Sequence, residues 1–405
     1  MPDSPAGPGR RLRAVPAGPG PAVLTTLLPA LRAALNGSGD AVLPHAADRA
    51  PAASLAPGTP LGPGEDDEHD PTVVVVSTSG SSGAPKGVLL GAAALLASAS
   101  ATHDRLGGPG RWLLALPAQH VAGVQVLVRS LVTKAEPAVL DLAGGFTPAG
   151  FAAAAAGLHG ARRYTALVPT QLVRLLDAAD QGDGDGLRAL AGFDAVLVGG
   201  AGTPAVVLER ASAAGVPVVT TYGASETCGG CVYDGVPLDG VRLRLEEGTG
   251  RILLGGPTLA RGYRGGDPDG AFVHGPDGER WWRTTDAGRL DGGRLTVLGR
   301  LDDAVLTGGM TVLPAAVEAV LLRLPGIAEA LVAGVDDPEW GQRVVAAVVP
   351  APGAPAPALA DVRARVEVEL GAHAAPRQLL VLDALPLVGV GKPDRAAVAR
   401  LAAGG

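Results

Sequence analysis

The chain has 405 residues, of which 47% are hydrophobic, and its formal net charge is −7 at pH 7. This length and hydrophobic content allow a large buried core, and we expect at least two domains. The acidic balance argues against a general nucleic-acid binder, and two cysteines, Cys228 and Cys231, are too few for a disulfide framework.

The beginning of the chain is predicted to be loop-like. Residues 1–22 are rich in Pro and Gly, and residues 56–70 combine Pro and Gly with acidic residues, which is typical of surface loops. No apolar run approaches the length of a membrane span, and no signal-peptide core follows the Pro/Gly-rich start. We therefore expect a cytoplasmic protein.

Residues 77–87 read S-T-S-G-S-S-G-A-P-K-G and follow the β-branched run 72–76, which predicts a buried strand. Such a loop suits a polyphosphate, because bare backbone can approach it and hydroxyl and amide groups can donate to its oxygens. It is not a Walker A loop, since Pro85 precedes Lys86 and Gly87 follows it. A Ser/Gly linker is the alternative, and the preceding strand argues against it. The residues predicted to bind phosphate are Ser77, Thr78, Ser79, Gly80, Ser81, Ser82, Gly83 and Lys86.

From residue 72 to about 222, apolar runs alternate with helical patterns, which predicts a parallel sheet covered by helices. The predicted strands are residues 111–116, 138–142, 164–168, 195–198 and 216–220. The predicted helices are residues 121–135, 148–158, 170–179 and 204–214.

Residues 232–298 have short strands with Gly/Asp turns, which predicts a small antiparallel or barrel-like region. A compact α+β unit is expected after residue 300, with helices at 314–323 and 358–370 and strands at 328–335, 343–349 and 378–382. The fold class is therefore α/β. Residues 1–300 are expected to form a large domain of helix-covered sheets with the barrel-like region, and residues 301–405 a small α+β domain.

The segment 77–87 resembles the phosphate loop of the adenylate-forming superfamily, which includes acyl-CoA synthetases, adenylation domains of peptide synthetases and luciferases. Further motifs follow in the family's order, and the resemblance covers nearly all of residues 70–400. It implies a mobile C-terminal domain and an active site between the two domains.

Residues 221–227, T-Y-G-A-S-E-T, resemble the family's Y-G-x-[ST]-E signature. The resemblance implies that Tyr222 packs on adenine, that Ser225 holds a phosphate and that Glu226 binds Mg²⁺. Magnesium prefers hard oxygen ligands shared with phosphate, which suits a carboxylate. A strand-end turn with an exposed glutamate is the plainer alternative. The nucleotide-binding residues that the resemblance implies in this segment are Tyr222, Gly223 and Ser225. The resemblance also implies that Gly199, Gly200 and Ala201 form the other wall of the adenine site.

Three further segments match motifs of the family. Asp286, in R-T-T-D, would accept from both ribose hydroxyls, although Thr285 stands where the family usually has glycine. In G-R-L-D-D, Arg300 would contact ribose or phosphates and Asp302 would be the pivot between domains, unless this run is a surface salt-bridge cluster. The resemblance further implies that Gly308 and Gly309 line a tunnel for the pantetheine arm of coenzyme A.

Lysine is rare, with three in the chain, and Lys392 lies in V-G-K-P-D-R, which resembles the family's G-K-x-x-R segment. The family's lysine enters the active site and stabilises the negative charge that builds up during adenylation. A solvated loop lysine is the alternative.

Two residues bear on the substrate. His120, in L-P-A-Q-H, resembles the residue that gates the acyl pocket, although a lone histidine is often structural. Arg129 lies nine residues on in an apolar helix pattern, where an arginine is costly unless it meets an anion or is exposed. In o-succinylbenzoate–CoA ligases, an arginine at this offset helps to bind the second carboxylate of the substrate. The alternative, an arginine on the helix surface, stays open.

Residues 220–238 and the short N-terminal region resemble the short actinobacterial o-succinylbenzoate–CoA ligases. The implied reaction uses ATP, Mg²⁺ and coenzyme A to make o-succinylbenzoyl-CoA in menaquinone biosynthesis. Whether the protein forms a homodimer stays open. Cys228 and Cys231 would be small thiols that line the pocket. The alternatives are a ligase for another aryl or short-chain acid, an adenylation domain that loads a carrier protein, and a non-catalytic nucleotide-binding module.

Overall fold

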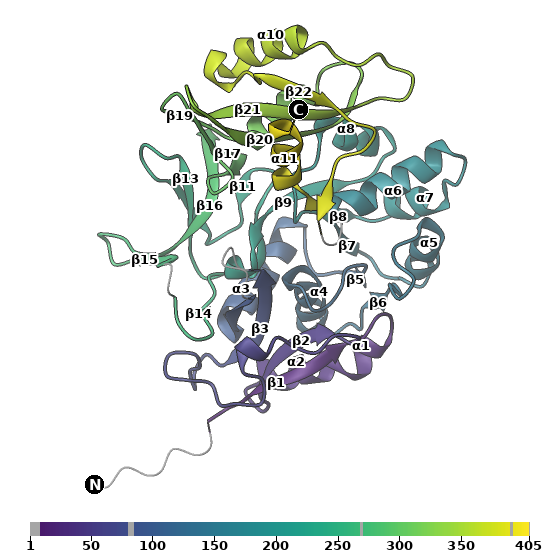
Figure 1. The fold of residues 1–405 in the computed structure, drawn as a ribbon. Coiled ribbons are helices and arrows are strands. Elements are labelled where there is room, and N and C mark those ends of the chain that lie inside the picture. Colours follow the sequence, from purple (N-terminus) through teal and green to yellow (C-terminus); the bar gives the residue numbers. More distant parts are fainter. Residues whose placement is uncertain (1–8, 80–84, 268–269, 389–391, 405) are drawn as a thin grey trace. The chain divides into compact units, whose positions relative to one another are not determined.

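The computed structural model describes residues 9–79, 85–267, 270–388 and 392–404 (Figure 1). The chain forms two compact units, one of Met1–Arg244 with Leu253–Arg283 and one of Leu245–Ile252 with Thr284–Gly405. The predicted domain boundary at residue 301 differs from this division, which assigns residues 284–300 to the second unit. A pivot at Asp302 stays a prediction. Within the described ranges, no helix combines the length and apolar character needed to cross a membrane.

The first unit begins with a mixed five-stranded sheet in the order β1-β2-β3-β4-β14. Its strands are β1 (Leu12–Ala17), β2 (Ala41–Ala46), β3 (Thr72–Ser79), β4 (Pro85–Gly91) and β14 (Gly262–Tyr263). Strands β1, β2 and β3 are parallel, and β4 is antiparallel to β3. The prediction that β3 joins the parallel sheet of the following segment is therefore wrong, since β3 pairs with β2 and β4 instead.

The prediction that residues 1–22 are loop-like is wrong for β1. Leu12, Val15 and Ala17 are buried, and all six residues of β1 pair with β2. Tertiary burial of these apolar side chains outweighs the Pro/Gly bias, and Pro16 is tolerated because β1 is an edge strand. The short helices α1 (Ala22–Thr25), α2 (Leu27–Leu35) and η1 (Ala53–Leu55) accompany this sheet.

A seven-stranded sheet in the order β11-β10-β9-β8-β7-β5-β6 forms the centre of the first unit. The five strands from β6 to β9 are parallel, which confirms the predicted rhythm, and β10 and β11 extend the sheet with antiparallel pairing. The strands are β5 (Arg111–Leu114), β6 (Ala138–Val139), β7 (Arg163–Leu167), β8 (Ala195–Val198), β9 (Val218–Ala224), β10 (Gly229–Tyr233) and β11 (Val236–Pro237).

Helices accompany the strands of this sheet, and the four predicted ones are present (Figure 1). A buried apolar cluster that includes Phe151, Leu172 and Val196 joins the helices α5, α6 and α8 to the sheet. The helices are α3 (Ala92–Arg105), α4 (Val121–Val132), α5 (Pro148–Ala156), α6 (Pro169–Asp180), α7 (Asp185–Ala191), α8 (Ala205–Ala213) and the 3₁₀ turn η2 (Ser225–Thr227).

The predicted region of short strands forms a sheet in the order β12-β13-β16-β15, with β17 paired to β16. Strands β13 and β16 contribute residues to both units. The strands are β12 (Arg242–Leu245), β13 (Arg251–Gly255), β15 (Phe272–His274), β16 (Arg280–Asp291) and β17 (Arg294–Arg300).

The rest of the second unit is the predicted α+β fold, a sheet in the order β19-β18-β21-β20 with β22 paired to β21. Because successive side chains on a strand point to opposite faces, Val332 and Val344 pack with helices α9 and α10, whereas Leu331 and Val345 pack with helix α11. The elements are β18 (Val305–Thr307), β19 (Met310–Val312), α9 (Pro314–Leu321), β20 (Ile327–Asp337), β21 (Gly341–Pro350), α10 (Leu359–Leu370), η3 (Ala372–Ala374), β22 (Gln378–Val381), β23 (Leu387–Val388), β24 (Lys392–Pro393) and α11 (Arg395–Ala403).

Candidate active site

Predicted site residues of the first unit lie at the carboxyl ends of parallel strands. His120 follows β5, Gly199–Ala201 follow β8, and Tyr222 and Glu226 lie at and beyond the end of β9. Ligands of open α/β sheets bind outside the carboxyl ends of the strands. The topology therefore brings motifs that are 100 residues apart in sequence to one edge of a sheet.

The predicted phosphate loop connects two paired strands. Across the β3–β4 hairpin, Ser77 lies opposite Gly87, and Thr78 lies opposite Lys86. The hydroxyl of Thr78 donates to the backbone carbonyl of Lys86 over 3.4 Å. The hairpin thus brings Lys86 next to the start of the loop. Gly80, Ser81, Ser82 and Gly83 lie outside the described residues, as does the side chain of Ser79.

Tyr263 connects two of the predicted site residues. Strand β14 pairs with β4, which places Tyr263 opposite Val88. The Nζ atom of Lys86 lies 5.5 Å from the centroid of the Tyr263 ring, and the Tyr263 hydroxyl donates to Oε1 of Glu226 over 2.9 Å. Tyr263 is not among the site residues predicted from the sequence. The one feature of the sequence that could have drawn attention to Tyr263 is the rarity of tyrosine, which occurs four times in the chain.

Glu226 is a partly buried carboxylate whose charge is opposed by burial and favoured by its neighbours. Burial raises its pKa, while the hydrogen bond from Tyr263 and the charge of Lys86 act in the opposite direction. Burial, and next the nearby Glu226 carboxylate, raise the pKa of Tyr263, so Tyr263 stays a neutral donor. Tyr263 and Lys86 thus offset part of the effect of burial and favour the ionised form of Glu226 that a metal would bind.

The residues around Glu226 fit a magnesium ion that arrives with a phosphate. Among the described residues, no group of three or more His, Cys, Asp or Glu side chains gathers to hold a metal by itself. Mg²⁺ bound with substrate phosphates needs only one or two carboxylates from the protein. A single glutamate beside a predicted phosphate loop meets that requirement.

The glycines of the predicted adenine site are required by the packing of the chain. A Cβ on Gly199 would lie 2.2 Å from Oγ1 of Thr221, and a Cβ on Gly223 would lie 2.1 Å from the carbonyl oxygen of Gly229. Gly200 has a φ of +84°, which favours glycine. These constraints explain the glycines without a ligand, so their nucleotide roles, and those of Ala201, Tyr222 and Ser225, stay predictions.

Arg129 lies in the interior of the first unit, with 3% of its surface exposed. Its Nη2 atom donates to Oγ1 of Thr102 over 3.2 Å and to the hydroxyl of Tyr233 over 3.4 Å. Its guanidinium carbon lies 4.9 Å from the ring centroid of Trp112. The alternative of an arginine on the helix surface is therefore wrong. His120, in contrast, precedes α4 as an exposed residue.

The positive charge of Arg129 has no acidic partner among the described residues. Burial lowers its pKa, and Tyr233 opposes that effect. Burial and the charge of Arg129 together lower the pKa of His103 to about 4, so His103 is neutral at pH 7. The Nε atom of Arg129 lacks a hydrogen-bond partner in the described part of the chain. A buried guanidinium without an acidic partner can bind an anionic group of a ligand.

The remaining predicted residues belong to the second unit. Asp286 lies opposite Arg300 across β16 and β17, and Nε of Arg300 donates to Oδ1 of Asp302 over 2.8 Å, within an ion pair. This hydrogen bond and the nearby acids raise the pKa of Arg300, although burial acts against them. The predicted roles of these residues toward a nucleotide are untested and stay predictions.

Gly308 and Gly309 form the turn between β18 and β19, with φ values of +56° and +77°. A Cβ on Gly308 would lie 2.9 Å from the ring of Trp340. The backbone of Lys392 lies in β24, opposite Val388. The side chain of Lys392 is not among the parts that the structure describes. The predicted roles of these three residues are likewise untested.

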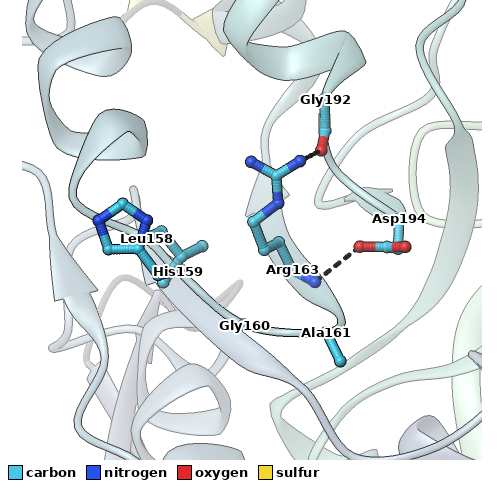
Figure 2. Close-up of a pocket in the computed structure, with 7 residues that line it drawn as sticks. All are labelled: Leu158, His159, Gly160, Ala161, Arg163, Gly192 and Asp194. Carbon is cyan, nitrogen blue, oxygen red and sulfur yellow. Dashed lines mark hydrogen bonds between the residues drawn. The ribbon is translucent and has the colours of Figure 1, made fainter.

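A separate pocket lies at the opposite ends of the strands (Figure 2). Arg163 begins β7 and Asp194 precedes β8, and the backbone amide of Arg163 donates to Oδ2 of Asp194 over 2.8 Å. The pocket contains none of the predicted site residues. It lies at the amino ends of the strands, away from the edge where α/β sheets bind ligands, and we assign it no part in the reaction.

The two cysteines are fully buried and form no disulfide. Burial raises the pKa of both thiols, for Cys231 to about 12. Both are therefore neutral at pH 7 and poorly reactive. Cys228 has a φ of +54° at the end of η2, immediately before the strand that packs beside α4.

Two family models and several known proteins match most of this chain. A model described as AMP-binding enzyme matches residues 32–264, and one described as AMP-binding enzyme C-terminal domain matches residues 316–392. A probable 2-succinylbenzoate–CoA ligase from Mycobacterium tuberculosis is 49% identical over 393 residues, which cover 96% of this chain and 98% of the relative.

Solved structures resemble the fold as well. Wild-type E. coli MenE with a bound m-phenylether-linked analogue of OSB-AMS has a TM-score of 0.75 and 25% identity, and the match covers 98% of this chain and 89% of that one. The o-succinylbenzoate coenzyme A synthetase of Bacillus subtilis, in complex with ATP and magnesium ion, has a TM-score of 0.65 and 28% identity over 81% of this chain and 70% of that one.

Proposed function

This chain belongs to the family of AMP-binding enzymes, and from that premise we propose that it is an ATP-dependent ligase that joins o-succinylbenzoate to coenzyme A. The relative from M. tuberculosis that matches nearly its full length bears the name probable 2-succinylbenzoate–CoA ligase. Such a ligase consumes ATP and coenzyme A, which supports a cytoplasmic location. Its product would serve menaquinone biosynthesis.

The observation that carries the reaction class is the arrangement of Lys86, Tyr263 and Glu226 beside the β3–β4 hairpin. In the first step, a carboxylate oxygen of the acid attacks the α-phosphorus of ATP, and the bond to pyrophosphate breaks. Lys86 and the backbone amides of the predicted phosphate loop would bind the triphosphate, and Glu226 would hold the metal. Mg²⁺, when bound, supplies positive charge that stabilises the leaving pyrophosphate.

In the second step, the thiolate of coenzyme A attacks the acyl carbon, and AMP leaves with the electrons of the broken bond. We assign Lys392 to the first step and Gly308 and Gly309 to the second. A rotation of the C-terminal domain about Asp302 would exchange them. Closure of the site excludes water, which protects the acyl-adenylate from hydrolysis.

The buried charge of Arg129 supports a substrate with two carboxylates. One carboxylate reacts, and the other would receive the guanidinium that has no acidic partner in the described residues. His120 would lie at the entrance of the acyl site. A charge-assisted contact contributes roughly 1.5–3 kcal/mol, which favours the diacid over a monoacid by about tenfold or more.

Pyrophosphate release tests this function directly. The full-length protein is incubated with ATP and Mg²⁺ and with o-succinylbenzoate, benzoate or a fatty acid, in the presence and absence of coenzyme A. Release that is greatest with o-succinylbenzoate, together with thioester formation only when coenzyme A is present, supports the proposal. A preference for another acid indicates a different CoA ligase, transfer only to a phosphopantetheinyl carrier protein indicates an adenylation domain, and no release with any acid indicates a non-catalytic module.

A further inference from the structure

Gln125 is a buried amide whose hydrogen-bonding groups lack partners in the described part of the chain. It lies in helix α4, and 1% of its surface is exposed. Neither Nε2 nor Oε1 has a hydrogen-bond partner among the described residues. A buried amide in this state costs free energy, because both groups lose hydrogen bonds to water. Its partner is therefore either a bound molecule or an internal water.

Gln125 lies beside the backbone that follows the Glu226 motif, and it shares helix α4 with Arg129. Its Cγ lies 3.6 Å from the place where a Cβ on Gly229 would stand, and Gly229 begins β10 three residues after Glu226. The side chain of Gln125 therefore lies against the backbone that directly follows the Y-G-x-[ST]-E motif. A larger residue at position 229 would meet the Gln125 side chain.

Gln125 and Arg129 are neighbours on one face of α4. Residues four apart in a helix have Cβ atoms about 5–6 Å apart and point in nearly the same direction. Both side chains are buried, and both keep hydrogen-bonding atoms without partners in the described residues, Nε in the case of Arg129. One turn of α4 thus places the Arg129 cation beside the Gln125 amide, and each could form further hydrogen bonds to one bound molecule.

We propose that Gln125 is a substrate-binding residue that donates from Nε2 to the non-reacting carboxylate of the acid, beside the charge of Arg129. The inference rests on the proposed function. Arg129 supplies the positive charge for this carboxylate, and Gln125 adds a directional hydrogen bond that orients it. An amide is suited to this role because it donates to a carboxylate oxygen without adding a second charge to be buried.

The test compares Gln125→Leu with Gln171→Leu. Gln171 is a buried glutamine with both groups satisfied, since Oε1 accepts from the amide of Val168 over 3.0 Å and Nε2 donates to the carbonyl of Ala115 over 2.9 Å. Steady-state pyrophosphate release gives the KM for o-succinylbenzoate and for ATP. The comparison acid is 3-benzoylpropionate, which has the same skeleton without the aromatic carboxylate. Urea unfolding gives the stability of each variant.

For Gln125→Leu we expect the KM for o-succinylbenzoate to rise about tenfold, with the KM for ATP and for 3-benzoylpropionate nearly unchanged. The stability should stay the same or rise, because an apolar side chain replaces groups without partners. Gln171→Leu should lose stability and leave all three KM values unchanged. Gln125→Glu should raise the KM for o-succinylbenzoate further than leucine does, because its charge repels the carboxylate.

Two results would overturn the inference. A KM for o-succinylbenzoate that stays unchanged in Gln125→Leu assigns the amide to an internal water. A loss of stability as large as that of Gln171→Leu, without a selective change in KM, assigns it to a structural role. Both results leave the proposed function intact if the parent protein uses o-succinylbenzoate. If the parent does not use it, the proposed function fails and this inference fails with it.

Discussion

The hydroxyl of Tyr263 donates a 2.9 Å hydrogen bond to Oε1 of Glu226, across 37 positions of sequence. The contact depends on the pairing of β14 with β4, which also carries Lys86. The carboxylate thus receives a neutral donor, and a cation lies over the same ring. Both lower the cost of holding a negative charge on Glu226 in a partly buried position.

Tyr263→Phe should shift the pH dependence of the enzyme. Burial raises the pKa of Glu226, and the Tyr263 hydroxyl opposes that rise, so its removal raises the pKa further. The metal needs the ionised form, so the acidic limb of the kcat profile should move to higher pH. The control is Tyr164→Phe, because the Tyr164 hydroxyl donates to the carbonyls of Leu106 and Gly108, away from Glu226. Equal shifts in both variants would contradict the assignment.

Glu226→Gln should lose activity but gain stability at neutral pH. The folded-state pKa of Glu226 is raised, so the native protein binds the proton more tightly than the unfolded chain does. Stability from this group is complete below the ordinary glutamate pKa of about 4.3 and declines as pH rises through the folded-state value. Urea unfolding should therefore show Glu226→Gln to be more stable than the parent at pH 8 and similar to it at pH 4. A difference that does not depend on pH would disprove this account.

Lys392→Ala should abolish formation of the acyl-adenylate while leaving thioester formation from supplied adenylate largely intact. The reason is that negative charge builds up at the α-phosphate only in the first half-reaction. Each half-reaction is measured separately, by pyrophosphate release and by thioester yield. Lys134→Ala, at an exposed lysine, is the control. Equal loss of both half-reactions in Lys392→Ala would rule out domain alternation.

Arg129→Met should raise the KM for o-succinylbenzoate by about tenfold or more and leave the KM for ATP nearly unchanged. Because Met replaces a buried charge that has no acidic partner in the described residues, the stability should stay the same or increase. The control is Arg210→Met, in a surface ion pair with Asp177 and Asp180. An unchanged KM for o-succinylbenzoate would remove Arg129 from the substrate site.

Glu65→Ala should destabilise the first unit. Glu65 forms an ion pair with Arg264 and accepts hydrogen bonds from the amides of Gly62 and Gly265. Burial alone would raise the pKa of Glu65, but these bonds and Arg264 outweigh it and lower the pKa. Loss of the carboxylate removes the acidic partner of Arg264 and the acceptor of both amides, and it should cost roughly 2–4 kcal/mol.

Urea unfolding at pH 7 measures the cost of Glu65→Ala. Arg188→Gln breaks the exposed pair with Asp185 and is the control, with an expected cost below about 1 kcal/mol. A similar cost for both variants would show that the ion pair of Glu65 contributes no more than a surface contact does. Because the carboxylate of Glu65 is favoured in the folded state, the parent should also lose stability as pH falls through the lowered pKa.

The sequence was informative wherever the signal is local. The five parallel strands, the four predicted helices of the first unit and the α+β order of the second unit follow from hydrophobic periods of 2 and 3.6 residues, which depend on near neighbours. Strand β1 was missed because its Pro/Gly context outweighed a short apolar alternation. The loop 56–70 was expected at the surface, yet Glu65 is held by Arg264, a residue about 200 positions away.

By itself, the sequence determined the family, the order of the motifs and the elements that carry them, because each is written in a short stretch of chain. Only the tertiary structure decided that Tyr263 bonds Glu226, that Arg129 is buried without an acidic partner in the described residues, and that Gln125 lies against Gly229. The physical reason is that a side chain's burial and hydrogen-bond partners depend on residues distant in sequence, which meet only when strands pair and helices pack.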